Sequence, residues 1–420
     1  MRKVLLICLT LWIGILSAQD SLKISTPLLE GLYTPPQNKI EIEGSYLINS
    51  TAINADFYSS LYQGKFIDDA LKNSVSSHLI ANNLFGAEIF AKGTYYNLKK
   101  RFNIGLSENI DFGLEFTGDA FKTIFYGNKE FVGKTIDLSH TEVKFMHSQS
   151  LSFGFTRDLH LTKDSIFAGS RTIDYGISLV KGQNLYELIM PKGSIFTEKN
   201  GEYLDITIKG NMYQSDENNN SLGAFNGLGA GLNFKYTELN EEEFGHRLIF
   251  EIKNLGLIRW NNNTNVDKMD TTLRFEGIAI DNIFAIQDST FNNVNVESVA
   301  GEGLKSSKAA HFILLPFSVR VNYRKYLSSK NYLEGEITYK YWGTYIPKLI
   351  VSYGRKLTKD ITAEINGGYG GYGTFHLGAN IFIETFNRFQ MRIGASDLGG
   401  FVLPKQFGNQ GLFFIASYSF

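Results

Sequence analysis

The sequence predicts one all-β domain, a transmembrane antiparallel β-barrel of about fourteen strands (fourteen to sixteen) with a short helical or plug segment. Its composition is rich in Gly (41), Phe (33) and Tyr (22) and poor in Pro (7), which favours strands and tight turns over helices. Apolar residues alternate with polar ones throughout the last hundred residues. Beyond the amino-terminal leader, no stretch is long and apolar enough for a transmembrane helix.

The leader, residues 1–18, is a predicted signal peptide. Arg2 and Lys3 precede an apolar run over residues 4–16, and the small residues that follow place cleavage after Ala18. Cys8, inside that run, is the only cysteine, so residues 19–420 exclude disulfides and thiolate metal sites. We therefore expect export to the outer membrane of a Gram-negative bacterium.

Nine strands are predicted in the amino-terminal half, which is less regular than the rest. Asn200-Gly201 marks a hairpin turn between two of them. The expected strands are Lys39–Ile48, Phe85–Leu98, Arg101–Thr117, Thr135–His147, Leu151–Arg157, Thr172–Val180, Glu202–Tyr213, Gly227–Leu239 and His246–Trp260.

The segment 66–85 breaks this pattern. Its apolar residues Ile67, Leu71, Val75 and Leu79 recur at helical spacing. A short helix that plugs the interior or caps one mouth is therefore expected between the first two strands.

Seven strands of about ten residues follow, the length that crosses a bilayer. They are predicted at residues 317–327, 332–342, 349–357, 361–371, 374–384, 388–396 and 411–420. One face of each is apolar, and the other holds ionisable groups expected to face the interior: Arg320, Arg324, Glu334, Glu336, Lys340, Arg355, Glu364, His376 and Arg392. These ionisable groups have two possible roles: they select solutes, or they pair across neighbouring strands and so stiffen the wall. Pairing is the favoured role for most of them.

Loop lengths predict an orientation. Short turns at 328–331, 358–360 and 385–387 alternate with connections at 343–347, 371–373 and 397–410. Because outer-membrane barrels keep short turns in the periplasm, the first set is expected there. The long polar segment 261–310 then lies outside or folds inward as a plug.

The final strand ends in aromatic residues, and we expect it to pair with the first strand, since an open edge in lipid is costly. Phe414, Tyr418 and Phe420 lie on its lipid face. They resemble the signal by which the barrel-assembly machinery recognises its clients.

Catalytic and metal motifs are not supported. GYGGYG (368–373) has the spacing of a dinucleotide loop, but a strand follows it where that motif needs a helix. The histidines form no HExxH pair, and the Asn- and Asp-rich stretches 216–221 and 261–270 are explained as turns. The net charge of −1 gives no reason to expect nucleic acid. We expect no enzyme, cofactor or metal, and a membrane-embedded hydrolase is kept only as an alternative.

Several stretches together resemble a Bacteroidetes family of outer-membrane β-barrels of unknown function, similar in style to the long-chain fatty-acid transporter and to type 9 secretion-associated barrels. They are GISLVKGQ (176–183), GLGAGLNFKY (227–236), NLGLIRWNNN (254–263) and LLPFSVRVNYRKYL (314–327). The resemblance covers residues 20–420 and implies a barrel of roughly fourteen strands with inward-folded segments, without implying a substrate.

The expected function is a transporter or pore for a small molecule, hydrophobic molecules included. The alternative is a non-catalytic scaffold or secretion accessory that binds partner proteins through segments 261–310 and 397–410. A secreted pair of soluble sandwiches is the structural alternative. Outer-membrane lipid and the barrel-assembly machinery are partners in either barrel hypothesis.

Overall fold

The computed structural model describes residues 36–127, 129–159, 169–200, 202–219, 221, 223–240, 245–275, 304–385 and 388–420. Residues Gln37–Phe420 form one compact unit. The predicted signal peptide at residues 1–18 lies outside the described residues. Among the helices of the described part, none has the length and apolar content needed to cross a membrane.

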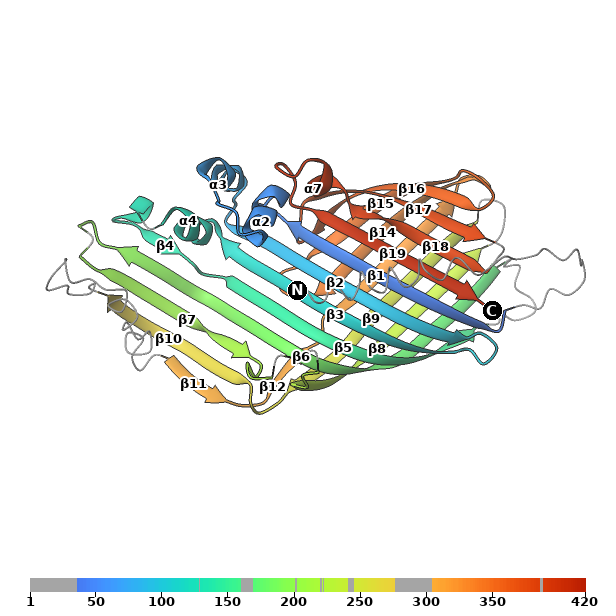
Figure 1. Cartoon of the computed structure of the whole chain (residues 1–420), viewed down its shortest axis with the longest axis horizontal. Coiled ribbons are helices and arrows are strands. Elements are labelled where there is room, and N and C mark those ends of the chain that lie inside the picture. The colour runs from blue at the N-terminus through green and yellow to red at the C-terminus, as the bar shows by residue number, and fades with distance from the viewer. Residues whose placement is uncertain are drawn as a thin grey trace, which may run out of the picture. The chain divides into compact units, whose positions relative to one another are not determined.

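Fourteen antiparallel strands close into a barrel, as the sequence predicts (Figure 1). Around the wall they are β1 (Asn38–Ser50), β2 (Asn82–Asn97), β3 (Phe102–Thr117), β5 (Thr141–Asp158), β6 (Gly169–Thr197), β8 (Gly227–Asn240), β9 (His246–Trp260), β13 (Phe317–Tyr326), β14 (Asn331–Tyr341), β15 (Ile346–Lys356), β16 (Ile361–Gly371), β17 (Phe375–Thr385), β18 (Phe389–Asp397) and β19 (Gln410–Ser419). The last strand pairs with the first from Lys39↔Ser419 to Ile48↔Gln410, which removes both open edges.

Two strands are longer than the sequence predicts, β5 and β6. The segments expected at 135–147 and 151–157 form one strand, β5, because β3 pairs with it without interruption from Phe102↔Phe155 to Glu115↔Glu142. The short strand β4 (Thr135–Asp137) stands apart from it. The strand expected at 172–180 is only part of β6, which runs for 29 residues.

The long strand β6 carries an extension of the wall beyond the barrel. It pairs with β8 as far as Gly182↔Gly227, and from Tyr186↔Gln214 onward it pairs with β7 (Leu204–Gln214). Outside β7 lie β10 (Asn265–Phe275) and then β11 (Leu304–Lys308), while β12 (His311–Leu314) pairs with the end of β9. The segment predicted at 261–310 therefore supplies strands of this extension, and its residues 276–303 lie outside the described part.

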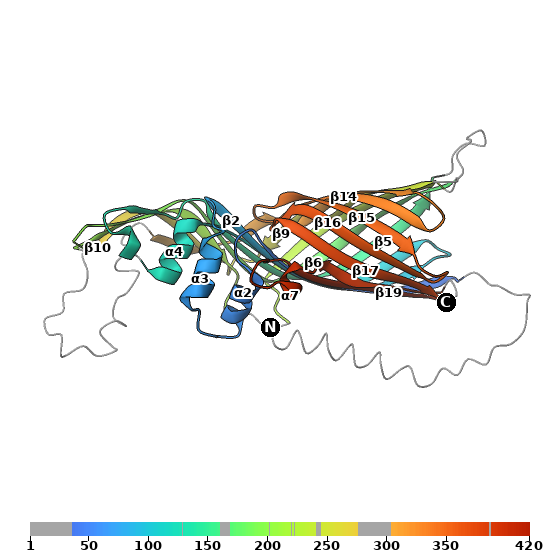
Figure 2. The ribbon, with the colours of Figure 1, turned by 90° about the horizontal axis from the view of Figure 1, so that it is seen from above.

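Helices cover the outer side of the wall where the extension begins (Figure 2). They are α2 (Ala55–Tyr62), α3 (Asp69–Ser76) and α4 (Gly118–Tyr126), followed by the 3₁₀ turn η2 (Lys129–Phe131), and the short α7 (Gly399–Val402) precedes β19. Each of the first three begins at a residue whose side chain accepts a backbone N–H: Asn54, Asp68 and Thr117.

The helix predicted within residues 66–85 is α3, and it is shorter than expected because Asn82 already pairs in β2. Its buried Val75 packs with Phe57 of α2, Phe121 of α4 and Phe116 at the end of β3. Phe116 alternates in phase with the exposed Leu106, so this cluster lies on the outward face of the wall. The sequence predicted a plug or a cap over a mouth, whereas the apolar stripe of α3 is buried against neighbouring helices.

The two ends of the barrel differ, and we name them by their connections. At the short-turn end, tight turns join β13 to β14 and β15 to β16, and Asn38 donates its N–H to the carbonyl of Phe420 at 2.9 Å. At the long-loop end lie α2, α3, α4, α7 and the extension. This alternation of short turns and longer loops agrees with the loop pattern of the sequence.

The two faces of the wall also differ. Each of the fourteen strands presents at least one exposed large apolar side chain on the outward face, such as Leu106, Ile365 and Leu377 at 66%, 62% and 61% exposure. The inward face holds buried charged groups, including Asp111 and Glu364. A wall that is apolar outside and polar inside is the inverse of a soluble barrel.

Candidate functional site

Lys340 on β14 bridges the interior near the long-loop end. Its Nζ lies 2.6 Å from Oδ1 of Asp111 on β3 and 2.8 Å from Oε1 of Glu88 on β2. Strands β5, β6, β8, β9 and β13 separate β14 from β3 along the wall, so the bridge spans the lumen and does not link neighbours. Its side chain is buried at 12% exposure, where a charge needs such partners.

Tyr372, in the turn between β16 and β17, closes the interior beside this bridge. It is 2% exposed, and its hydroxyl donates to the backbone carbonyl of Trp342. Its ring lies against Gly86 of β2, where a Cβ atom would stand 2.0 Å from ring carbon Cδ2. Tyr345 packs edge-on against Tyr372, with 5.1 Å between ring centroids. Only glycine at position 86 leaves room for this aromatic lid.

An apolar layer fills the mouth next to the lid. Its buried residues come from five parts of the wall and its loops: Met146, Val180, Leu185, Ile258, Trp260, Leu315 and Trp342. Trp260 is fully buried, and its ring occupies the space that a side chain at Gly182 would fill, 2.7 Å from the Cβ position there. The layer therefore depends on small residues in the facing strands.

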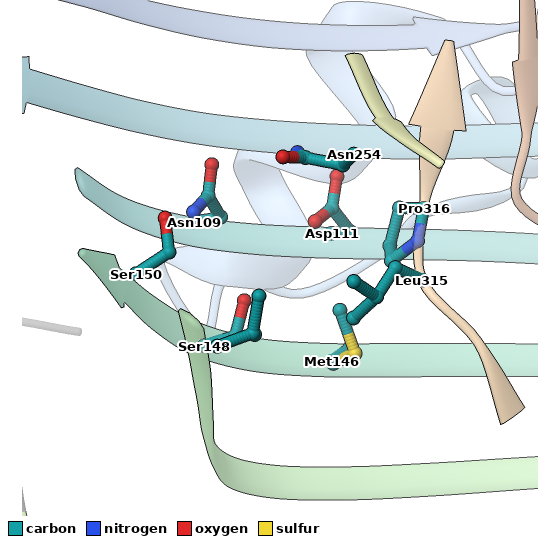
Figure 3. A pocket seen from close by; sticks show the side chains of 9 residues that line it. Asn109, Asp111, Met146, Ser148, Ser150, Asn254, Leu315 and Pro316 are labelled. Carbon is teal, nitrogen blue, oxygen red and sulfur yellow. The ribbon is translucent and has the colours of Figure 1, made fainter. Parts of the chain in front are cut away.

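A polar cavity of about 20 Å³ lies beneath the layer (Figure 3). Asp111, Asn109, Ser148 and Ser150 line one side, while Leu315 and other layer residues line the other. This volume holds about one water molecule, so it marks a small polar gap under the closed mouth. The mouth separates this polar region from the extension.

A charged cluster occupies the wall toward the short-turn end, with Glu364 of β16 at its centre. Its carboxylate accepts from Arg392 at 2.8 Å, from the hydroxyl of Tyr332 at 2.7 Å and from the amide of Asn380 at 2.8 Å. Arg324 lies 3.7 Å away. Glu364 is only 4% exposed, and three hydrogen-bond donors together with the Arg324 guanidinium, on four different strands, compensate for its burial.

The cluster continues through Glu334, which lies 2.6 Å from Arg324 and 2.9 Å from Arg247. Arg320 pairs with Glu251 at 2.8 Å and Glu336 at 3.5 Å. Six of the nine predicted interior residues thus form ion pairs in this part of the wall, in two neighbouring groups: Arg324, Glu334, Glu364 and Arg392 in one, and Arg320 and Glu336 in the other. Each ion pair compensates for the free-energy cost of placing a charged side chain in the interior.

Arg355 was expected to face the interior, and the structure corrects this. It is exposed and alternates in phase with the outward-facing Leu349, Val351 and Tyr353 of β15. Strand periodicity places residues two apart on the same face, so Arg355 belongs to the outward side near the short-turn end.

His376 is buried on the inward side of β17 and braces the lid. Its Nδ1 lies 2.7 Å from Oδ1 of Asp397, and its Nε2 lies 2.8 Å from the carbonyl oxygen of Gly370. Gly370 has φ +113°, a conformation that favours glycine, and leads directly into the turn that carries Tyr372. His376 is thus a positioning residue that ties this turn to the end of β18.

A second charged group lies where the extension meets the mouth. Glu187 of β6 is 3.2 Å from Nε2 of His311 and 3.6 Å from Nζ of Lys144. The ring of Tyr213 stacks on His311, with 3.7 Å between centroids. Burial, with the nearby Glu187 carboxylate, raises the pKa of the Tyr213 hydroxyl above its ordinary value.

Substitution of Gly86 tests whether Tyr372 seals the mouth. We expect Gly86→Ala to displace the Tyr372 ring, since the added Cβ would stand 2.0 Å from it. In the Gly86→Ala background, a cysteine at Asn109, in the cavity below, should react with a maleimide added from the long-loop side at least ~10-fold faster than in the unsubstituted background. A tenfold ratio corresponds to a loss of ~1.4 kcal/mol in the free energy that favours the closed mouth. Gly93→Ala on the same strand is the matched control, because no atom lies within 4 Å of its Cβ position. Equal labelling rates in both variants would refute the seal.

Sequence reasoning missed Asp111, Glu88, Trp342 and Tyr372 as parts of this mouth. Asp111 and Glu88 sit on polar faces of predicted strands, but their partner lies on a distant strand. The available signal was Gly86, an inward-facing glycine in a strand, which marks the close approach of another group.

The fold and this interior define the class, a closed antiparallel fourteen-stranded β-barrel with a polar, occluded lumen. The chain belongs to a family of unknown function (DUF5723), whose model matches residues 16–395. This confirms the expected resemblance to a family without an assigned function.

Comparison with solved structures finds similar barrels at low identity. The Pseudomonas putida toluene transporter TodX has a TM-score of 0.42 and 10% identity, covering 92% of this chain and 91% of that one. A Pseudomonas aeruginosa FadL homologue has a TM-score of 0.38 and 11% identity over 91% and 90%. The translocator domain of the autotransporter NalP from Neisseria meningitidis has a TM-score of 0.32 and 6% identity, covering 100% of this chain and 98% of that one. No curated protein matches the chain.

Proposed function

We propose that this protein is an outer-membrane barrel that passes a small molecule, hydrophobic molecules included, and that the conformation described above is its closed state. The Lys340 bridge and the Tyr372 lid carry the proposal. Both close the interior with side chains that can withdraw while the ladder of the wall stays intact. A barrel built only as a structural support would need neither.

Insertion in a membrane is supported by the outward face. Exposed apolar side chains occur on all fourteen strands, far more apolar surface than a soluble monomer leaves in water. Aromatic pairs gather near the short-turn end, with ring centroids 6.3 Å apart for Tyr95–Phe102 and 6.1 Å for Phe155–Tyr175. Such aromatics line the interfaces of membrane barrels, and this end faces the periplasm in the proposal.

Reconstitution tests the proposed passage. Purified protein in planar bilayers is expected to show low conductance, and proteoliposomes to take up small solutes slowly. Gly86→Ala should raise both rates, while Gly93→Ala should leave them unchanged. Absence of conductance and uptake in the wild type and in Gly86→Ala alike would refute a transport function.

The proposed assembly signal concerns the last strand. Tyr418 and Phe420 are 50% and 47% exposed, and their rings stack with 6.2 Å between centroids. The ring of Phe414 covers Gly44 of β1. We expect Phe420→Ala to slow insertion of newly made chains, measured as the heat-modifiable form on a gel, with little effect on barrels already folded. Tyr369→Ala, an exposed aromatic elsewhere on the outward face, is the control. Normal insertion of Phe420→Ala would count against the signal.

A scaffold that binds partner proteins is the second candidate, favoured by the extension. Strands β7, β10 and β11 continue the wall outside the closed barrel and contribute nothing to its closure. Deleting residues 261–310 should abolish capture of a stable partner in a pull-down if the scaffold hypothesis holds. A transporter without partners would yield the same proteins with and without the segment.

A further inference from the structure

The outward wall has a cavity where β6 exchanges one neighbour for another. Its ladder with β8 ends at Gly182, and its ladder with β7 begins at Tyr186. Asn226 bridges this fork, because its side-chain amide donates to the carbonyls of Gln183 and Asn219, each at 2.7 Å. A cavity of about 220 Å³ opens at the fork.

Strand alternation places this cavity on the outside of the wall. Phe145 is in phase with the exposed Phe153 and Phe155 of β5. Tyr186 stands directly opposite Phe145, and Gln214 stands directly opposite Tyr186. The cavity therefore opens on the outward side of the wall, and Leu185 of the apolar layer is one of its lining residues.

The lining combines two aromatic rings with several polar side chains. Within the described residues, the side chains of Asn184, Tyr186, Gln214 and Glu217 make no hydrogen bond. They offer both donors and acceptors beside the rings of Phe145 and Tyr186. Rings that cover C–H groups, with amides and acids that reach hydroxyls, suit a polyhydroxylated ring.

The volume of the cavity and the charge of its lining further restrict the class of ligand. A cavity of about 150 Å³ accepts a benzene ring, so this one admits a single six-membered sugar ring. Asp216 and Glu217 are the charged lining residues, and no cation lines the cavity. An anionic ligand would therefore be repelled, while a neutral one would not.

The surroundings favour a site at the edge of the apolar belt. Leu106 and Leu179 belong to the outward apolar surface, and two residues further along the same strands stand Glu108 and Lys181. The amide of Gln149 links this pair, donating to Glu108 at 2.7 Å and accepting from Lys181 at 3.3 Å. The cavity lies beyond this polar row, where the headgroups of a bilayer that covers the belt would begin.

From these features we propose that the cavity at the β6 fork binds a neutral saccharide unit, either of a free glycan or of a glycolipid headgroup. Phe145 and Tyr186 form the stacking walls, and Asn184, Gln214 and Glu217 hold the hydroxyl groups. The proposed saccharide site opens on the outward face of the wall, so its test does not depend on whether the barrel transports a molecule.

A glycan array tests the proposal, with the full-length mature protein kept in an amine-oxide detergent that has no sugar headgroup. Neutral oligosaccharides should retain the wild type, and Tyr186→Ala should weaken retention at least ~10-fold, the ratio given by ~1.4 kcal/mol. Tyr186→Phe keeps the ring and should keep binding. Tyr175→Ala removes an exposed aromatic from the outward face of the same strand and is the matched control. Heat-modifiable gel mobility confirms that each variant is folded.

A neutral glycolipid, galactosyl diacylglycerol, in nanodiscs and its free headgroup sugar distinguish the two sources. Binding of both, weakened by Tyr186→Ala, assigns a site for free saccharide. Binding of the nanodisc form alone, again weakened by Tyr186→Ala, assigns a headgroup site. The proposal is overturned if no neutral glycan or glycolipid binds, if only acidic glycans bind, or if Tyr175→Ala weakens binding as much as Tyr186→Ala.

Discussion

Replacement of Lys340 with alanine is expected to open the barrel. The change leaves the buried Asp111 and the half-buried Glu88 without the ammonium that lies 2.6 and 2.8 Å from them. Losing one partner of a buried pair costs about 3–5 kcal/mol, enough to move a closed-to-open ratio on the order of 100-fold or more. Single-channel conductance in planar bilayers should therefore rise strongly.

Lys340→Arg is the control, because it keeps a cation that reaches both carboxylates. Its conductance should stay close to that of the wild type. If Lys340→Ala conducts no better than Lys340→Arg, the bridge does not hold the mouth closed, and the lid and apolar layer suffice.

Replacement of Glu364 with alanine should cause the largest loss of stability. Three hydrogen-bond donors converge on this carboxylate, and its removal leaves Arg392 and the hydroxyl of Tyr332 without this acceptor. We expect the free energy of unfolding to fall by about 3–5 kcal/mol. Denaturant unfolding in detergent, followed by tryptophan fluorescence, measures the change.

Asp205→Asn supplies the comparison for Glu364. Asp205 pairs with Arg274 at 2.7 Å on the extension, but this pair is exposed, and exposed pairs contribute little. Glu364→Gln retains one acceptor oxygen and should lie between the wild type and Glu364→Ala. Equal stability of Glu364→Ala and Asp205→Asn would show that the cluster is not a structural centre.

Alternation predicted the barrel because the side-chain period of a strand depends on local residues alone. Alternation could not predict the length of a strand where pairing with neighbouring strands determines that length. β5 continues through the gap expected between residues 147 and 151 because β3 pairs with it on both sides of that gap. β6 extends beyond its predicted segment because it pairs with β7 after its pairing with β8 ends. The extension was missed for the same reason, since β10 is a strand through its pairing with β7.

The charged cluster was foreseeable for a similar reason, because neighbouring strands bring inward residues such as Arg324 and Glu334 together. The mouth was not foreseeable. Lys340 was expected to face the interior, but the face of a strand does not specify a partner across the lumen. Tyr372 lay in a stretch interpreted as a glycine-rich turn, and nothing in that turn indicates that Gly86 receives its ring.

The Lys340 bridge also has a consequence for the order in which the chain folds. Lys340 and Asp111 are 229 positions apart, as are Thr344 and Glu115, whose side chains also bond. Neither contact can form until the intervening strands have assembled, so both arise late, after most of the entropy of loop closure has been lost. Contacts formed after the rate-limiting step slow unfolding without speeding folding. The same ammonium that bridges the lumen therefore prolongs the lifetime of the finished barrel, and a half-built barrel lacks this bridge.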